Sequence, residues 1–202
     1  MTQADIDHCP RIVAQMGPEP FVEAMEAQPD FNLLIGGRAY DPSPFVAFAT
    51  FCFRQLLPQN DKSFSNNILG SFMHMGKILE CGGSCAKPKS SGAMATIYQD
   101  GTYDIRPLAP NSRCTPLSVA AHTLYEKSRP DILSGPGGYF DVTQTQYEQL
   151  GDNRTVRVRD DRFQTSAAQG VPYQVKLEAA KMVGFRSMYI GSMRDRKWPP
   201  GS

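Results

Sequence analysis

The segment of residues 74–85, HMGKILECGGSC, holds an imidazole, a carboxylate and two thiols in a chain that has only three histidines and five cysteines. The apolar and small residues before it predict a helix over Asn66–Leu79, which the following glycine pair ends because glycine turns freely. The polar groups therefore gather at a helix end. Such groups can exchange protons with a substrate when partial burial brings their pKa values toward neutrality. The candidate catalytic residues are Glu80, His74 and Cys81.

A second mechanism would use a thiol as a covalent nucleophile. Cys81 or Cys85 would then need a base within hydrogen-bond reach and an oxyanion hole, for which the N–H groups of Gly82 and Gly83 are candidates. Cysteine also often acts as a small buried apolar side chain. Glu80 has comparable alternatives, because a glutamate at a helix end can face solvent or pair with a nearby arginine. The residues alone leave both mechanisms open.

Acid–base chemistry on an organic acid also needs cations that neutralise a carboxylate or an enolate oxygen. Arg38 and Lys77 are one candidate pair, and Lys87 and Arg113 are another. A zinc site is not expected, because the two cysteines of the segment are four residues apart and no second pair follows. Signatures for nicotinamide cofactors, P-loop nucleotides, zincins and α/β-hydrolases are missing from the sequence. We therefore expect neither a metal ion nor a cofactor.

Residues 31–57 predict a strand, a glycine turn and a helix that together could hold an anionic ligand. Residues 31–35 form the apolar strand, Gly36 and Gly37 turn the chain, and the helix then runs to residue 57. Asp41 would be its N-cap and Pro42 its first residue. Backbone N–H groups at such a helix start favour anions, although an ordinary tight turn is the alternative. The candidate substrate contacts here are Gly37, Arg38 and Asp41.

The remaining elements follow from periodicity and turn residues. Residues 18–28 predict a helix with Phe21, Val22 and Met25 on one face, and residues 94–108 predict a hairpin with its turn at Asp100-Gly101. Thr115 and Pro116 would begin a helix that carries His122, a histidine more typical of a core or surface position than of a catalyst. Further candidate strands are residues 139–143, 155–159, 172–178 and 185–190, with a turn at 151–153.

The length of 202 residues predicts a single domain over the whole chain. A βα half with several helices, at about residues 9–130, would precede an antiparallel β-rich half at about residues 131–195. The expected fold class is therefore α/β with a mixed sheet.

The composition bounds the partners and the compartment. The chain has 21 basic and 20 acidic residues, so its net charge predicts binding neither to nucleic acid nor to an anionic membrane surface. No apolar stretch is long enough to cross a bilayer without a charge or proline. The N-terminus lacks the pattern of a secretory signal, and an odd number of cysteines favours reduced thiols. We expect a cytoplasmic protein.

Four motifs occur in order along the chain: LLIGGRAYDPSPF, a helix that ends in HMGKILECGG, the hairpin YQDGTYDI, and CTPLSVAAHTLYEKSRPDILSGPGGYFDV. In this order they resemble the acyclic terpene utilisation (AtuA-like) family over about residues 9–195. The family pattern has a GR-x-x-DPS/A turn after a strand, LECG after a helix, and a serine-bearing helix that ends in LYE. The matching positions are Gly37, Arg38, Asp41, Pro42, Glu80, Cys81, Gly82, Thr115, Ser118 and Glu126.

The resemblance implies an α/β protein that acts on small organic acids or acyl thioesters, and it supplies no catalytic residues. Members of the family are usually much longer, with an α/β portion before the region matched by Cys9 and a further segment after the region matched by Asp195. We expect this chain either to act on a changed substrate or to complete its cleft as a homo-oligomer.

These arguments together predict an isomerase, cyclase or lyase of the hydro-lyase type. It would act without a cofactor on a terpenoid-, polyketide- or acyl-derived organic acid. The expected substrate-binding residues are Gly37, Arg38, Asp41, Lys77, Arg113 and Ser118. The alternatives are a non-catalytic small-molecule binding protein, which would tolerate the loss of Glu80 and His74, or a subunit of a larger complex.

Overall fold

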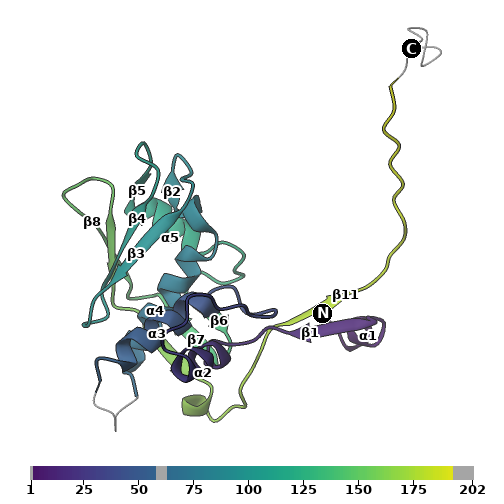
Figure 1. The fold of residues 1–202 in the computed structure, drawn as a ribbon, viewed down its shortest axis with the longest axis horizontal. Coiled ribbons are helices and arrows are strands. Elements are labelled where there is room, and N and C mark those ends of the chain that lie inside the picture. The colour runs from purple at the N-terminus through teal and green to yellow at the C-terminus, as the bar shows by residue number, and fades with distance from the viewer. Residues whose placement is uncertain (1, 58–62, 193–202) are drawn as a thin grey trace. The chain divides into compact units, whose positions relative to one another are not determined.

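A computed structural model describes residues 2–57 and 63–192 of the chain, which form five α-helices, two short 3₁₀ helices and eleven strands (Figure 1). The α-helices are α1 (Gln3–Asp7), α2 (Glu19–Ala27), α3 (Ser43–Arg54), α4 (Asn66–Leu79) and α5 (Pro116–Thr123), and the 3₁₀ helices are η1 (Gly82–Cys85) and η2 (Ala167–Gln169). The strands are β1 (Arg11–Ala14), β2 (Ala86–Lys87), β3 (Ala93–Ile97), β4 (Tyr103–Pro107), β5 (Arg113–Cys114), β6 (Ile132–Gly135), β7 (Gly138–Asp141), β8 (Gln146–Gln149), β9 (Val156–Arg159), β10 (Arg162–Thr165) and β11 (Leu177–Ala180). The predicted α/β class is confirmed.

The chain divides into two compact units. Residues 13–178 form the larger unit, and residues 2–12 and 179–192 are the described part of the smaller one. The larger unit contains every cavity and polar cluster described below. Residues 193–195, the last part of the predicted β-rich half, lie outside the described residues.

Four small sheets organise the strands. The largest has the order β3-β4-β9-β8, a second has the order β10-β7-β6, and two-stranded sheets are formed by β2-β5 and β1-β11. The pairs within the two larger sheets and the β2-β5 pair are antiparallel. Three of the pairs, β3-β4, β6-β7 and β8-β9, join consecutive strands through short connections, whereas the other four pairs join strands that are distant in the sequence.

Helix α4 is the central element of the larger unit. It contacts α3, α5, β3, β7 and β10 (Figure 1), and nine of its residues, from Gly70 to Ile78, are buried. Its start is fixed by Ser65, whose hydroxyl accepts the N–H of Ile68 at 3.3 Å. Gly70 lets α4 approach β10 closely, because a Cβ there would lie 2.6 Å from the backbone N of Arg162. Side chains on α4 are therefore held by neighbours on several sides.

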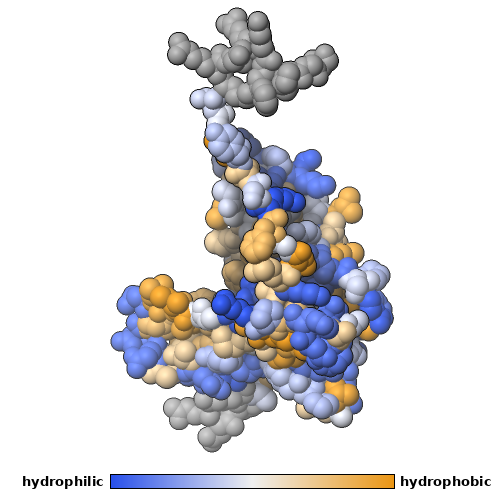
Figure 2. All heavy atoms as spheres, turned by 90° about the vertical axis from the view of Figure 1, so that its right-hand side faces the viewer, coloured by the Kyte–Doolittle hydropathy of each residue, from blue (hydrophilic) through white to orange (hydrophobic). Residues whose placement is uncertain are grey.

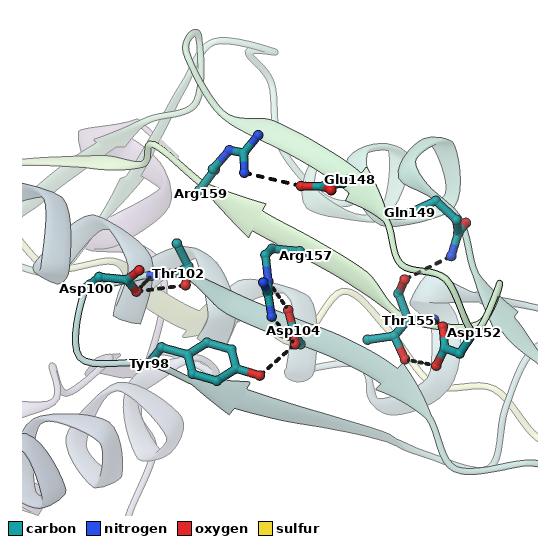
Figure 3. A network of polar contacts seen from close by, with 10 residues as sticks. All are labelled: Tyr98, Asp100, Thr102, Asp104, Glu148, Gln149, Asp152, Thr155, Arg157 and Arg159. Atoms are coloured by element: carbon teal, nitrogen blue, oxygen red, sulfur yellow. Dashed lines mark hydrogen bonds and ion pairs between the residues drawn. The ribbon is translucent and has the colours of Figure 1, made fainter.

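The exposed face of the four-stranded sheet carries a polar network (Figure 3). Arg157 of β9 lies opposite Asp104 of β4 in register, and its guanidinium donates two hydrogen bonds to that carboxylate at 2.8 and 2.9 Å. Tyr98 donates a third at 2.8 Å. The alternate positions Val156 and Val158 are buried, so the period of two separates this network from the core.

Several predicted elements are confirmed. The helices expected over 18–28 and 66–79 are α2 and α4, and the face of α2 with Phe21, Val22 and Met25 is buried. The predicted hairpin is β3-β4. Thr115 caps α5, because its hydroxyl accepts the Ser118 N–H at 3.1 Å. The strands expected at 139–143 and 155–159 are β7 and β9.

The strand predicted at residues 31–35 does not form. These residues lack regular structure, Leu33 and Ile35 are 75% and 84% exposed, and the only nearby pairing is a single bridge between Met16 and Ala39. An apolar run becomes a strand only where another strand satisfies its backbone groups, and the described residues place none beside it. The prediction for Asp41 was also wrong, since α3 begins at Ser43 with Pro42 in the N-cap position and without a side-chain cap.

Two late strand predictions are also corrected. Of residues 172–178 only Leu177 and Glu178 are in a strand, as the start of β11, and residues 185–190 form none. Phe185 is 92% exposed, because no described strand pairs with this segment. Apolar side chains thus remain on the surface, where Figure 2 shows orange areas between the hydrophilic blue ones. Within the described residues no helix has the length and apolar character that crossing a bilayer requires.

Candidate acid–base site at the end of helix α4

Lys77 and Glu80 form a buried ion pair at the C-terminal end of α4. Their side chains are only 2% and 5% exposed, and the ammonium of Lys77 donates a hydrogen bond to the Glu80 carboxylate. Residues three apart on a helix lie on the same face, so the helix itself brings the two groups together. The sequence left open a pairing of this carboxylate with an arginine, whereas the structure pairs it with a lysine.

Burial raises the pKa of Glu80 above its ordinary value, and the hydrogen bond from Lys77 only partly opposes this. Glu80 is also the C-cap residue of α4, where the negative end of the helix dipole disfavours a second negative charge. The pKa of Glu80 thus lies closer to physiological pH than the pKa of an exposed glutamate, and this direction of shift favours proton transfer.

Tyr40 is close enough to Glu80 to feel its charge, and it contacts a second lysine. The Tyr40 hydroxyl accepts a hydrogen bond from the Lys127 ammonium at 2.9 Å, and the Lys127 nitrogen lies 5.2 Å from the centre of the Tyr40 ring. Burial and the charge of Glu80 raise the pKa of Tyr40, so its hydroxyl stays protonated. Burial and the charge of Lys77 lower the pKa of Lys127 to about 8.

Two further rings surround Lys77. The Lys77 nitrogen lies 5.6 Å from the centre of the Tyr125 ring, and the His122 ring stacks on Tyr125 with an interplanar angle of 13°. His122 is buried, its Nε2 atom has no hydrogen-bond partner, and burial followed by the charge of Lys77 lowers its pKa. We call the set of Tyr40, Lys77, Glu80, His122, Tyr125 and Lys127 the Lys77 cluster.

Two cavities border the Lys77 cluster, and Tyr40 lines both of them. The first has a volume of about 530 Å³ and is lined by Glu80 together with the predicted binding residues Gly37, Arg38 and Asp41. The second has a volume of about 300 Å³ and is lined by Glu126, Lys127 and Ser134, among others. Both volumes suit small molecules. The structure thus brings four residues predicted from separate motifs to the wall of one cavity.

Arg38 is already engaged by carboxylates of the protein. Its guanidinium donates to both oxygens of Glu178, at 2.5 and 2.8 Å, and lies 3.4 Å from Asp41. The hydrogen bond to Glu178 raises the pKa of Arg38. A substrate carboxylate would have to share this guanidinium with Glu178 or displace it.

Cys81 follows Glu80 and is partly buried. Burial and the neighbouring Glu80 charge raise the pKa of its thiol, which keeps the sulfur in the less nucleophilic form. Cys85 is buried, and its sulfur lies 4.0 Å from that of Cys114. All five cysteines are free thiols, in agreement with the expectation of a reduced chain.

His74 belongs to a separate network. Its side chain is 0% exposed, with Nδ1 2.9 Å from Asp161 and Nε2 2.7 Å from the hydroxyl of Thr123. Asp161 is equally buried and accepts further hydrogen bonds from Tyr103 at 3.1 Å and Thr145 at 2.5 Å. His74 lines none of the cavities described here.

Arg113 and Ser118 also lie apart from the Lys77 cluster. Arg113 is exposed on β5, opposite Lys87 of β2. Ser118 is buried in the first turn of α5, where its hydroxyl donates to the carbonyl of Cys85 at 2.7 Å and accepts the Thr115 N–H at 2.9 Å. These contacts fix the start of α5 against η1.

A third cavity, of about 480 Å³, is mainly apolar. Side chains from α2, α3, α4 and β10 line it, including Val22, Val46, Met73 and Phe163. Arg54 also borders it, and the Nε of Arg54 is buried without a hydrogen-bond partner. This space fits a hydrocarbon body with one hydrogen-bond acceptor.

Sequence reasoning did not single out Tyr40, Tyr125 or Lys127 for the site. Tyr40 stands between two predicted binding residues, Arg38 and Asp41, which was an available signal. Lys127 follows the LYE motif directly, but a lysine in a polar loop ordinarily indicates a solvated side chain. Its partner Tyr40 lies 87 residues away in the sequence, so no periodic pattern indicates this contact.

The comparison with protein families matches residues 3–198 to the acyclic terpene utilisation family protein AtuA. Searches of curated proteins and of solved structures gave no significant match. The matched region covers nearly the whole chain and includes the motifs that form the first cavity and the end of α4. The family name links it to small-molecule metabolism. The chain belongs to the acyclic terpene utilisation (AtuA) family.

Proposed function

We propose that the protein is an enzyme that isomerises, cyclises, or eliminates from or adds to a small organic acid by acid–base chemistry, without a cofactor. The observation that carries this proposal is the buried Lys77–Glu80 ion pair, whose carboxylate residue Glu80 lines the 530 Å³ cavity. An acid–base pair protected from bulk water and open to a ligand-sized space is the arrangement that proton transfer at carbon needs.

In this proposal each group has a defined role. Glu80 takes or delivers the proton, because its raised pKa makes the carboxylate a stronger base than that of an exposed glutamate. Lys77 stabilises negative charge that develops on the substrate. Arg38 holds the substrate carboxylate, and the cavity wall at Gly37 and Asp41 positions it. Terpenoid, polyketide and acyl-derived acids are the substrate classes that the family name and the cavity volume favour.

His74 has a positioning role in this proposal. Its contacts with Asp161 and Thr123 tie the middle of α4 to the residue before β10 and to α5. Lys77 and the C-cap residue Glu80 follow one to two turns further on. Cys81 remains a thiol next to the reacting carboxylate, and covalent catalysis is not part of the mechanism. A homo-oligomer and a cytoplasmic location remain expectations from the sequence.

The test compares wild type with Glu80→Gln by mass spectrometry on a panel of unsaturated and hydroxylated acids and their thioesters. Conversion to an isobaric product, or to one that differs by water, should fall about 10²–10⁴-fold in the variant while ligand binding persists. Glu148→Gln is the matched control, because Glu148 is exposed on β8, borders none of these cavities and, within the described residues, forms its ion pair with Arg159. Equal turnover by all three proteins would refute the role of Glu80.

A second candidate function is non-catalytic binding of an apolar small molecule, favoured by the 480 Å³ cavity and the unpaired Nε of Arg54. Decanoate, with an apolar chain and one carboxylate, is a suitable probe for titration calorimetry. Val46→Trp should fill the cavity and weaken decanoate binding by about tenfold or more, whereas Glu80→Gln should leave it unchanged. Decanoate binding that is equally tight in Val46→Trp and wild type would exclude this cavity as the binding site.

A further inference from the structure

Lys127 occupies an unusual position for a loop lysine. It follows α5 and is partly buried, and its ammonium donates hydrogen bonds to the Tyr40 hydroxyl at 2.9 Å and to the Ser134 carbonyl at 3.2 Å. Both acceptors are neutral. Within the described residues no carboxylate forms an ion pair with Lys127 at contact distance. The amine is therefore oriented by the protein without being neutralised by it.

The amine borders the 300 Å³ cavity, and the charges around that cavity are mostly positive. Its lining includes three cations and one carboxylate, which are Lys127, Arg129, Lys176 and Glu126. Arg129 is paired with Asp131 at 2.6 and 3.0 Å. The other charged residues of the lining are two cations, Lys127 and Lys176, and one carboxylate, Glu126. Tyr40, Ser128, Ser134 and Gln174 add polar groups to the wall. A small polar anion fits this lining better than an apolar or cationic ligand.

The surroundings also favour the neutral, nucleophilic form of the amine. Burial and the charges of Lys77 and Lys176 lower the pKa of Lys127 to about 8, against the opposing effect of Glu80 and Glu126. About one molecule in ten then carries a neutral amine at pH 7. An ordinary lysine, with a pKa of about 10.5, is neutral about 300-fold less often. Burial beside another cation is a known way to activate a lysine toward carbonyl groups.

We propose that Lys127 is a carbonyl-reactive amine that forms an imine with a small oxo acid held in this cavity. The neutral Nζ attacks the carbonyl carbon, the C=O π bond breaks, and one proton moves from the nitrogen to the oxygen, which gives a carbinolamine. The C–O bond then breaks, the hydroxyl group leaves as water with the second proton of the nitrogen, and a C=N bond forms. The step needs no oxidant or reductant.

Tyr40 is placed to assist the loss of water. Its hydroxyl lies 2.9 Å from the amine, and burial and the charge of Glu80 raise its pKa, so the hydroxyl keeps its proton. It can donate that proton to the departing oxygen and recover one from the nitrogen. The carboxylate of the oxo acid would face Lys176 and the free donors of Arg129.

This inference goes beyond the proposed function, because imine formation requires neither Glu80 as a base nor turnover. The two ideas can therefore fail separately. Glu80 raises the pKa of Lys127, so Glu80→Gln should leave imine formation unchanged or make it faster, whereas it should slow the proposed acid–base reaction about 10²–10⁴-fold.

The experiment is reductive trapping of the full chain with pyruvate and sodium cyanoborohydride at pH 7, followed by peptide mass spectrometry. Lys127 should carry the reduced adduct at least about tenfold faster than the exposed Lys89, since its larger neutral fraction outweighs its lower basicity. Lys127→Arg should remove the fast-reacting site, and Lys89→Arg should retain it. Tyr40→Phe should slow trapping at Lys127 and leave Lys89 unaffected. Circular dichroism establishes that each variant is folded.

Three results would overturn the proposal. Equal rates at Lys127 and Lys89 would show that the cavity does not activate the amine. A folded wild type without an adduct at Lys127 would show that the cavity does not admit the oxo acid. Fast trapping that persists in Lys127→Arg would place the reactive amine elsewhere.

Discussion

The buried Asp161 carboxylate offers the sharpest test of the network around His74. Asp161 accepts three hydrogen bonds, from His74, Tyr103 and Thr145, and both Asp161 and His74 are 0% exposed. Asp161→Asn keeps the shape of the side chain and removes its charge. The adjacent Asp160 is exposed, and its carboxylate reaches Arg159 only at 4.0 Å. Asp160→Asn is therefore the matched control.

The magnitude follows from the number and type of these bonds. A hydrogen bond to a charged group contributes about 1.5–3 kcal/mol and a neutral one about 0.5–1.5 kcal/mol. Asn can still accept from His74 and Thr145 with its oxygen, while the Tyr103 hydroxyl rotates to accept from the new amide. Three bonds that each lose roughly 1 kcal/mol of charge assistance amount to about 3 kcal/mol. For the exposed control we expect a change within about 0.5 kcal/mol.

Urea unfolding at neutral pH measures this difference. With a slope of about 2–3 kcal/mol/M, the midpoint of Asp161→Asn should fall by about 1 M while the slope stays constant. The control should unfold with the wild type. If both variants lose the same free energy, within about 0.5 kcal/mol, the Asp161 network does not stabilise the fold and the positioning role of His74 is refuted.

Three further predictions concern other parts of the larger unit. Gly70→Ala should cost about 1–3 kcal/mol in urea unfolding, although alanine favours helices, because its Cβ would meet the backbone of Asp161 and Arg162 at 2.7 and 2.6 Å. Thr115→Ala should cost about 1 kcal/mol by the same measurement through loss of the α5 cap, and Thr115→Ser should restore it. Wild type should gain stability over Lys127→Met as pH rises from about 8 to about 10.5, because the unfolded chain then binds a proton that the folded chain has released. Below pH 8 the difference in stability between the two proteins should be constant. If thermal unfolding shows no gain of wild type over the variant between about pH 8 and 10.5, the lowered pKa of Lys127 is contradicted.

The fold was predictable where local signals decide the structure. Helix α4 has the predicted bounds because Ser65 caps it, an apolar pattern runs through it and glycines follow it. The α5 start and the β3-β4 hairpin likewise depend on turn and cap chemistry within a few residues. The strand predicted at residues 31–35 depended on a partner strand, and sequence periodicity does not state whether one is present.

The site was predictable only in part, for a related reason. Glu80 and Lys77 lie three residues apart on a helix, so their contact follows from helical geometry. The position of Gly37, Arg38 and Asp41 in one cavity wall with Glu80 did not follow from the motifs, because it requires the packing of α3 on α4. The contact of Lys127 with Tyr40 joins residues 87 positions apart. No local pattern specifies such a contact.

Helix α4 contributes residues to two acid–base pairs, which differ in whether a ligand can reach them. His74 and Asp161 are sealed, and each polar atom of that pair has a partner inside the protein. A fully satisfied buried network stabilises a single packing arrangement, and it leaves no donor or acceptor for a ligand. Glu80 is also buried, but it borders a cavity and its charge is disfavoured by burial and by the helix end. The sequence predicted His74 as a catalytic residue, yet a proton can reach a bound molecule only from the pair that has a cavity beside it, which is Lys77 and Glu80.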